Sequence, residues 1–174
     1  HASKTIYLAE TTSDLQVERD RLRRELLERG HRVVPDQPLP LQFGAFEASV
    51  RQFLAMADVA VHLVGNRYGL IPEDADRSMV DLQNLIAAES CRADNGDGDG
   101  DGDRLERLIW MPRDVQPSDE RQAAFITALV EDPSSHLGGE VVRDTLPNLK
   151  ILLLDDVPAA ASSCSFCGCG CGSG

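Results

Sequence analysis

The chain has 174 residues, a formal net charge of −12 and 42% apolar residues, values that suit one globular domain with a full core. No apolar run approaches the roughly 20 residues that span a bilayer, and charged residues begin at Lys4, so we expect neither membrane insertion nor a signal peptide. Nucleic-acid binding depends on phosphate neutralisation by Lys and Arg, which an acidic chain without a basic run supplies poorly. We therefore expect a cytoplasmic protein with no nucleic-acid or membrane partner.

The first structural unit is a strand that runs into a tight turn and then a helix. The apolar run at residues 5–9 predicts the strand, which stops at Glu10 and a group of hydroxyl residues. Ser13 is expected to cap the following helix, with Gln16 completing a capping-box pattern, and Gly30 is expected to end it.

Strands and helices then alternate along the chain. Further strands are predicted at residues 32–34, 59–64 and 105–111. Further helices are predicted over 46–57, over 79–91, and after Ser118 as the cap. Residues 146–155 fit either a fifth strand or a helix, and Pro147 in a first-turn position favours the helix.

This alternation predicts an α/β fold. We expect a three-layer α/β/α sandwich with a flavodoxin-like parallel sheet of four to five strands. The domain is expected to cover residues 4–157, with a flexible acidic Asp-Gly insert at 94–103, and a flexible Cys/Gly-rich tail at 158–174. Neither the insert nor the cysteine spacing of the tail fits an ordinary calcium or zinc site, so no metal is expected.

Several polar residues have structural interpretations. His62 lies within an apolar strand and is expected to be buried and hydrogen-bonded. Basic residues alternate with acids on the first helix, which favours a solvated, ion-paired face formed by Arg19, Arg21, Arg23 and Arg24. On the third helix, the apolar spacing predicts a buried arc formed by Met79, Leu82, Leu85 and Ile86, with Asp81 and Gln83 just outside its two edges.

Three motifs follow one another in a regular order. They are residues 7–15 followed by Glu18-Arg19-Asp20, residues 61–69, and residues 78–83. In this order they resemble the first strand and helix, the third strand with its loop, and the start of the third helix of bacterial Toll/interleukin-1 receptor (TIR) domains. The resemblance covers about residues 4 to 131 and implies a TIR-like domain.

The resemblance implies a function. Many bacterial TIR domains cleave the nicotinamide–ribose bond of NAD or cyclise the ADP-ribose product, often as effectors of antiphage defence or signalling. NAD is then the substrate, no resident cofactor is expected, and a homo-oligomer or TIR–TIR assembly is implied. The bond breaks through an oxocarbenium-like ribose, whose positive charge a carboxylate stabilises.

In the catalytic TIR domains that carboxylate is a glutamate on the third helix, and this chain has none at the expected place. After Ser78 the candidates are Asp81 and Gln83. If Asp81 takes the role, a shorter carboxylate serves; if Gln83 aligns with the family glutamate, the chain is inactive. Asp81 also fits a purely structural role, because an acid in the first turn suits the helix dipole.

The ligand-binding residues are expected where strands end, because ligands bind at the carboxyl edge of parallel sheets. Thr11 begins a hydroxyl-rich turn suited to a phosphate, Arg67 suits a diphosphate, and Tyr68 suits stacking on a base. The full set is Glu10, Thr11, Asp36, Asn66, Arg67, Tyr68 and Ser78. Capping and turn formation explain several of these residues equally well.

Two other functions remain open. One is a TIR assembly or adaptor module that acts by homotypic self-association without catalysis. The other is a nucleoside deoxyribosyltransferase-like enzyme, since Ile6-Tyr7-Leu8-Ala9 resembles the first strand of that family. That family continues with a Gly-Pro-type turn, which Glu10-Thr11 does not match.

Overall fold

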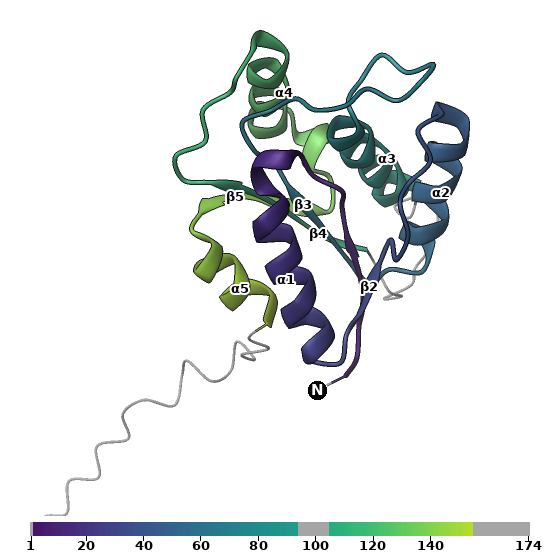
Figure 1. The fold of residues 1–174 in the computed structure, drawn as a ribbon, viewed down its shortest axis with the longest axis vertical. Coiled ribbons are helices and arrows are strands. Elements are labelled where there is room, and N and C mark those ends of the chain that lie inside the picture. Colours follow the sequence, from purple (N-terminus) through teal and green to yellow (C-terminus); the bar gives the residue numbers. More distant parts are fainter. Residues whose placement is uncertain (1, 94–104, 155–174) are drawn as a thin grey trace, which may run out of the picture.

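A computed structural model describes residues 2–93 and 105–154 of the chain. The expected acidic insert at 94–103 and the Cys/Gly-rich tail at 158–174 lie outside the described residues. One parallel sheet runs through the centre of the molecule with helices on both sides, as Figure 1 shows. The strand order β2-β1-β3-β4-β5 is the flavodoxin-like order, so the expected fold class is confirmed.

The elements alternate regularly along the chain. The strands are β1 (Thr5–Leu8), β2 (Arg32–Val34), β3 (Val59–Leu63), β4 (Glu106–Pro112) and β5 (Gly139–Asp144). The helices are α1 (Gln16–Glu28), α2 (Phe43–Ala55), α3 (Met79–Ala93), α4 (Glu120–Glu131) and α5 (Leu146–Leu154). Two short 3₁₀ turns are η1 (Ser13–Leu15) and η2 (Pro133–His136).

Each face of the sheet carries its own set of helices. On β1, Ile6 and Leu8 pack with α1 and α5, whereas Tyr7 packs with α2 and α3. A third cluster joins β4 to α3 and α4 through Ile109, Met111, Val80 and Phe125, among others. Alternate residues of the inner strands therefore point to opposite hydrophobic layers, as expected for a parallel sheet covered on both sides.

The edge strand β5 was not predicted from the sequence. It pairs with β4 in register from Arg107–Gly139 to Pro112–Asp144. Its side chains are only partly buried, Glu140 and Arg143 are exposed, and the two adjacent valines do not alternate with polar residues. The segment therefore has neither the continuous apolar run that is typical of a central strand nor the apolar–polar alternation that is typical of an outer strand. The helix favoured for residues 146–155 is confirmed as α5.

Two predicted helix caps are wrong. Ser13 begins the η1 turn, α1 starts only at Gln16, and no side chain caps the first position of either segment. The cap of α4 is Asp119, whose carboxylate accepts a 3.0 Å hydrogen bond from the backbone N–H of Gln122. The predicted end of α1 is confirmed, because Gly30 has a positive φ of 85°, which glycine adopts readily.

The predicted solvent exposure was wrong at three positions. The side chain of Arg19 is buried, and its guanidinium donates to the backbone oxygens of Leu8 at 2.9 Å and Ala9 at 3.0 Å. On α3, Leu85 is 36% exposed whereas Gln83 is completely buried. The helix lies between α2 and α4 as well as against the sheet, so its buried arc is wider and rotated from the one that apolar residues alone indicate.

Candidate functional site

Three loops meet at the carboxyl edge of the sheet, and hydrogen bonds tie them together. The Asp14 carboxylate accepts from the backbone N–H of Asn66 at 2.8 Å. The side-chain oxygen of Asn66 accepts from the N–H of Gln116 at 2.8 Å, and its backbone oxygen accepts from Ser118 at 2.8 Å. The predicted binding residue Asn66 is thus engaged in holding loops together.

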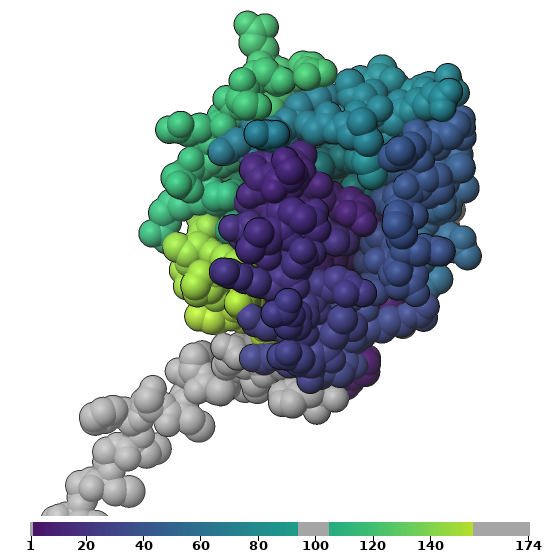
Figure 2. All heavy atoms as spheres, in the orientation of Figure 1, coloured from purple at the N-terminus to yellow at the C-terminus, as the bar shows by residue number. Residues whose placement is uncertain are grey.

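Gly65 makes this close approach possible. A Cβ atom at that position would collide with the Asp14 carboxylate and crowd the side chain of Leu15. Figure 2 shows the loop after β3 crossing the top of α1 on its way towards α2. No local pattern in the sequence indicates this contact, because it joins residues 52 positions apart.

Two hollows flank these tied loops. The first, here called the β1–β2 cleft, has a volume of about 490 Å³ and contains the predicted residues Glu10 and Asp36. Glu10 has a side chain that is 27% exposed and lies 3.6 Å from the guanidinium of Arg19. Asp36 is exposed at the end of β2. Three carboxylates and two cations therefore share this cleft: Glu10, Asp20, Asp36, Arg19 and Arg23.

The second hollow, here called the loop cavity, has a volume of about 600 Å³. It brings together Thr11, Arg67 and Tyr68, three of the predicted residues, with Thr12 and Ser13. Thr11 already donates its hydroxyl to the backbone oxygen of Leu63 at 2.8 Å, which holds the turn against β3. The loop cavity is rich in hydroxyls and contains one cation, Arg67, which suits a phosphate, and one carboxylate, Asp119, at its border.

Gln83, one of the two candidates on α3, points to the end of β1 and is completely buried. Its amide oxygen accepts from the Tyr7 hydroxyl at 2.7 Å and from the backbone N–H of Glu10 at 3.0 Å. Its amide nitrogen donates to the backbone oxygens of Glu10 at 3.1 Å and Met79 at 3.0 Å. Both acceptor lone pairs and both N–H groups of this amide are thus used inside the protein.

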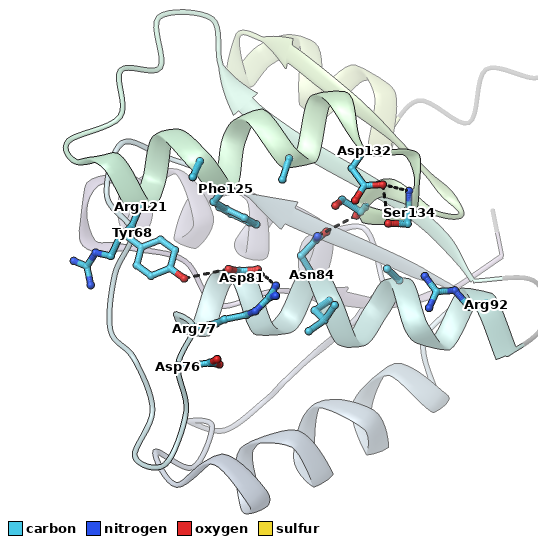
Figure 3. A pocket seen from close by; sticks show the side chains of 15 residues that line it. Tyr68, Asp76, Arg77, Asp81, Asn84, Arg92, Arg121, Phe125, Asp132 and Ser134 are labelled. Carbon is cyan, nitrogen blue, oxygen red and sulfur yellow. Dashed lines mark hydrogen bonds and ion pairs between the residues drawn. The ribbon is translucent and has the colours of Figure 1, made fainter.

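Asp81, the other candidate, points to the opposite side of α3, into a groove between α3 and α4 (Figure 3). One carboxylate oxygen accepts from the Tyr68 hydroxyl at 3.1 Å, and the other lies 3.5 Å from the guanidinium of Arg77. Burial raises the pKa of Asp81, while Arg77 and Tyr68 oppose that rise. The hydroxyl of Ser78 accepts from the backbone N–H of Asp81 at 3.2 Å and so caps the helix.

The α3–α4 groove has a volume of about 560 Å³, within the usual range for ligand sites. Its charged lining residues are Asp76, Arg77, Asp81, Arg92, Arg121 and Asp132. Tyr68 closes one end, with the Arg121 guanidinium 5.0 Å from the centre of its ring, and Ser134 lies at the other end beside Asp132 (Figure 3). The groove can accommodate a polar ligand with both charged and planar parts.

A buried polar cluster lies beneath the groove, and sequence reasoning missed it. Arg107 is 4% exposed and donates to the backbone oxygens of Leu137 and Asn84 and to the Asn84 side chain. Burial lowers the pKa of Arg107 to about 10. His62 is buried as predicted, but neither of its ring nitrogens has a hydrogen-bond partner among the described residues. The sequence feature that could have indicated this cluster is Arg107, a charged residue next to the apolar run of β4.

The structure therefore distributes six of the nine predicted site residues over three hollows, whereas Asn66, Ser78 and Gln83 line none of these three. Glu10 and Asp36 line the β1–β2 cleft, Thr11 and Arg67 line the loop cavity, and Asp81 lines the α3–α4 groove. Tyr68 is shared by the last two. Asp81, a candidate acid, and Glu10, a predicted ligand-binding residue, therefore line different hollows.

Other kinds of site have less support. Within residues 2–93 and 105–154, no group of three or more His, Cys, Asp or Glu side chains is arranged to hold a metal ion. In the same part of the chain, no helix has the length and apolar character needed to cross a membrane. Comparisons of the chain with protein-family models, with curated proteins and with solved structures gave no match.

Proposed function

We propose that the chain is a TIR-like domain that cleaves the nicotinamide–ribose bond of NAD, with Asp81 as the acid that faces the ribose. The proposal rests chiefly on one observation: the Asp81 side chain is only 13% exposed, yet lies at a groove of ligand size between Tyr68 and Arg77. Carboxylates that are desolvated and fixed by specific partners in a hollow are typical of functional sites.

The chemistry follows from the fixed position of this carboxylate. As the bond from the ribose to nicotinamide breaks, nicotinamide leaves with the electron pair and the ribose becomes positively charged. A carboxylate already oriented in a partly dry groove stabilises that charge without reorganisation. Water then adds to the ribose carbon and loses a proton, which gives ADP-ribose. If an adenine nitrogen adds instead, the product is cyclic.

The rest of the groove suits the remainder of the substrate. Arg92 and Arg121 are cations that line the groove, and guanidinium groups bind phosphate oxygens strongly. The Tyr68 ring is only 7% exposed and lies under the Arg121 guanidinium, so a base or nicotinamide would stack on it only by displacing Arg121. A dinucleotide is therefore a better match to this lining than a purely apolar ligand.

The test is an assay of nicotinamide release from NAD, with chromatography as the detection method. The protein is used at high concentration, with and without a crowding agent. We expect Asp81→Asn to lower turnover by about 100-fold or more, as loss of a preorganised charge does. Asp76→Asn is the matched control, because Asp76 lines the same groove but is not bonded to Tyr68. Equal turnover in Asp81→Asn and the unaltered chain would exclude Asp81 as the acid.

A non-catalytic assembly module is the second candidate, and two observations favour it. Gln83 is an amide whose donors and acceptors are already used inside the protein, so it cannot supply an acid. Leu41 and Leu70 are 57% and 58% exposed on the two loops beside the sheet edge, where a second copy could cover them. Homotypic assembly of this kind is how signalling TIR domains act.

Light scattering over a range of protein concentrations distinguishes the two candidates. Under the assembly proposal, the mass grows with concentration, nicotinamide is not released at any concentration, and Leu41→Ser with Leu70→Ser restores a monomer. Turnover by a preparation that remains monomeric would contradict this second proposal. If the chain cleaves NAD, a role in bacterial defence is tested by expressing it in cells and measuring the fall in cellular NAD.

A further inference from the structure

Tyr68 separates the loop cavity from the α3–α4 groove. Its side chain is only 7% exposed and lines both hollows. Its hydroxyl donates to Asp81 on the groove side, and the Arg121 guanidinium lies over its ring (Figure 3). One phenol thus contacts the candidate acid and borders a second cavity.

The backbone on both sides of Tyr68 is held in place. Asn66 is fixed by its bonds to Asp14, Gln116 and Ser118. On the other side, Gly69 has a φ of 88°, and the backbone oxygen of Leu70 accepts from the N–H of Met79 at 2.8 Å. A ligand that enters the loop cavity would therefore be accommodated by rotation of the Tyr68 side chain rather than by movement of the loop.

The hydrogen bond to Asp81 is the specific contact that such a rotation would break. The cation over the ring is an exposed arginine, with 59% of its side chain accessible, and it is also paired with Asp119. A cation–π contact at an exposed position is weak, so it offers little resistance to rotation. The position of the phenol thus depends on its hydrogen bond to the Asp81 carboxylate and on the packing of its ring in the cluster with Val80 and Phe125.

We propose that Tyr68 is a positioning residue which couples the two hollows: a planar group that enters the loop cavity displaces the phenol and releases one oxygen of Asp81. The ligand class is a nucleotide or the nucleotide half of a larger substrate, because Arg67 and the hydroxyls of Thr11 and Ser13 line the cavity beside the ring. The role of Asp81 as an acid rests on the proposed function, whereas the coupling itself does not.

The coupling is measured by titrating the Asp81 carboxyl carbon by NMR, with AMP as the probe. A hydrogen bond donated to a carboxylate favours its charged form, so loss of the Tyr68 hydroxyl raises the titration midpoint. A bond of ordinary strength corresponds to a rise of about 0.5–1 pH unit. We expect this rise in Tyr68→Phe without ligand, and a similar rise in the unaltered chain saturated with AMP.

Two controls complete the experiment. AMP added to Tyr68→Phe should cause a clearly smaller rise than in the unaltered chain, because the bond is already absent and only the charge of the phosphate can act. Arg121→Gln removes the cation over the Tyr68 ring but leaves the hydrogen bond between Tyr68 and Asp81 in place. The Asp81 titration midpoint in this variant should match that of the unaltered chain. Unchanged midpoints in Tyr68→Phe and in the AMP-saturated chain would overturn the proposal, as would failure of AMP to perturb Thr11, Arg67 and Tyr68.

Kinetics provides a readout that a merely structural role would not change. If NAD is cleaved, Tyr68→Phe should lower kcat by about 10-fold with little change in KM, and its pH profile should move with the Asp81 midpoint. Absence of nicotinamide release from the unaltered chain would refute the proposed function but leave the NMR result valid. Normal turnover with a fixed midpoint would refute the coupling alone.

Discussion

The amide oxygen of Gln83 accepts a 2.7 Å hydrogen bond from the hydroxyl of Tyr7, and this bond joins α3 to β1 inside the core. The same amide holds the backbone of Glu10 from both sides. A residue first considered as a substitute for a catalytic glutamate therefore secures the point where β1 leaves the sheet. Its chemistry is that of a buried, neutral clamp.

Gln83→Glu is expected to destabilise the fold, and increasingly so as pH rises. The new carboxylate would face the backbone oxygens of Glu10 and Met79 in place of a donor, in a fully buried position. We expect a loss of about 2–4 kcal/mol near neutral pH. Because burial raises the folded pKa of such an acid, the loss should shrink as pH falls towards 4.

Urea unfolding at pH 5 and pH 8 measures this effect. Gln83→Met is the matched control, because it keeps the length of the side chain and carries no charge. Its stability loss should be the same at both pH values. A Gln83→Glu variant as stable at pH 8 as at pH 5 would contradict the expected buried carboxylate.

Ionisation of Tyr7 is expected to limit the stability of the fold at alkaline pH. Burial raises the pKa of the Tyr7 phenol well above its ordinary value, and the nearby Glu10 charge adds to this rise. The stability that depends on the neutral phenol is therefore fully present below pH 10 and is lost as pH rises above it. Tyr7→Phe should lose about 1–2 kcal/mol at pH 8 and then decline less steeply than the unaltered chain between pH 10 and 11.

Thermal unfolding followed by circular dichroism across pH 7 to 11 tests the Tyr7 prediction. Tyr68→Phe is a useful comparison, because that phenol lies at a cavity rather than in the centre of the core. Parallel curves for Tyr7→Phe and the unaltered chain above pH 10 would show that the Tyr7 phenol does not limit alkaline stability.

Arg19 is expected to be a stabilising residue rather than a surface charge. Its guanidinium donates to the last carbonyl groups of β1, at Leu8 and Ala9, and lies near Glu10. Arg19→Met retains much of the packing but leaves two buried backbone oxygens without this donor. We expect a loss of about 2–3 kcal/mol in urea unfolding, against under about 0.5 kcal/mol for the exposed control Arg21→Met. Equal losses in the two variants would contradict this role.

His62 is expected to weaken the fold in acid. The buried ring has no hydrogen-bond partner among the described residues, and its pKa is lowered first by burial and then by the Arg107 charge. The unfolded chain binds a proton near pH 6.5 whereas the folded one does not, so stability falls as pH drops below 6.5. We expect His62→Leu to be at least as stable at pH 7 and clearly more stable at pH 5.

The measurement for His62 is the unfolding midpoint in urea at pH 5, 6 and 7. His31→Leu serves as a control, because its Nδ1 accepts from the backbone N–H of Lys4 and the residue is only partly buried. A pH dependence below 6.5 that is unchanged in His62→Leu would assign acid sensitivity to other groups.

Patterns along the chain were sufficient where burial dominated. The apolar run at β3 and the alternation of strands with helices predicted the parallel sheet, because a strand covered on both faces must be apolar throughout. The strand β5 could not be recognised from the sequence, since Glu140 and Arg143 face solvent and the strand lies at the end of the sheet. Its position became clear only from its pairing with β4.

The candidate site was less predictable than the fold. Asp81 and Gln83 are two residues apart, yet one faces a groove and the other is buried in the core. A helix turns about 100° per residue, so the two side chains are separated by more than half a turn. Which of them reaches a hollow depends on the helices packed on either side of α3, and no local pattern contains that information.

By itself, the sequence determined the alternation of the first four strands with helices and the acids available for chemistry, because hydrophobic periodicity and composition are local properties. Only the tertiary structure decided that Gln83 closes the core, that Arg19 is buried, and that Tyr68 stands between two hollows. Those outcomes depend on contacts between segments far apart in the chain, where close packing and the need to satisfy buried polar groups select one arrangement.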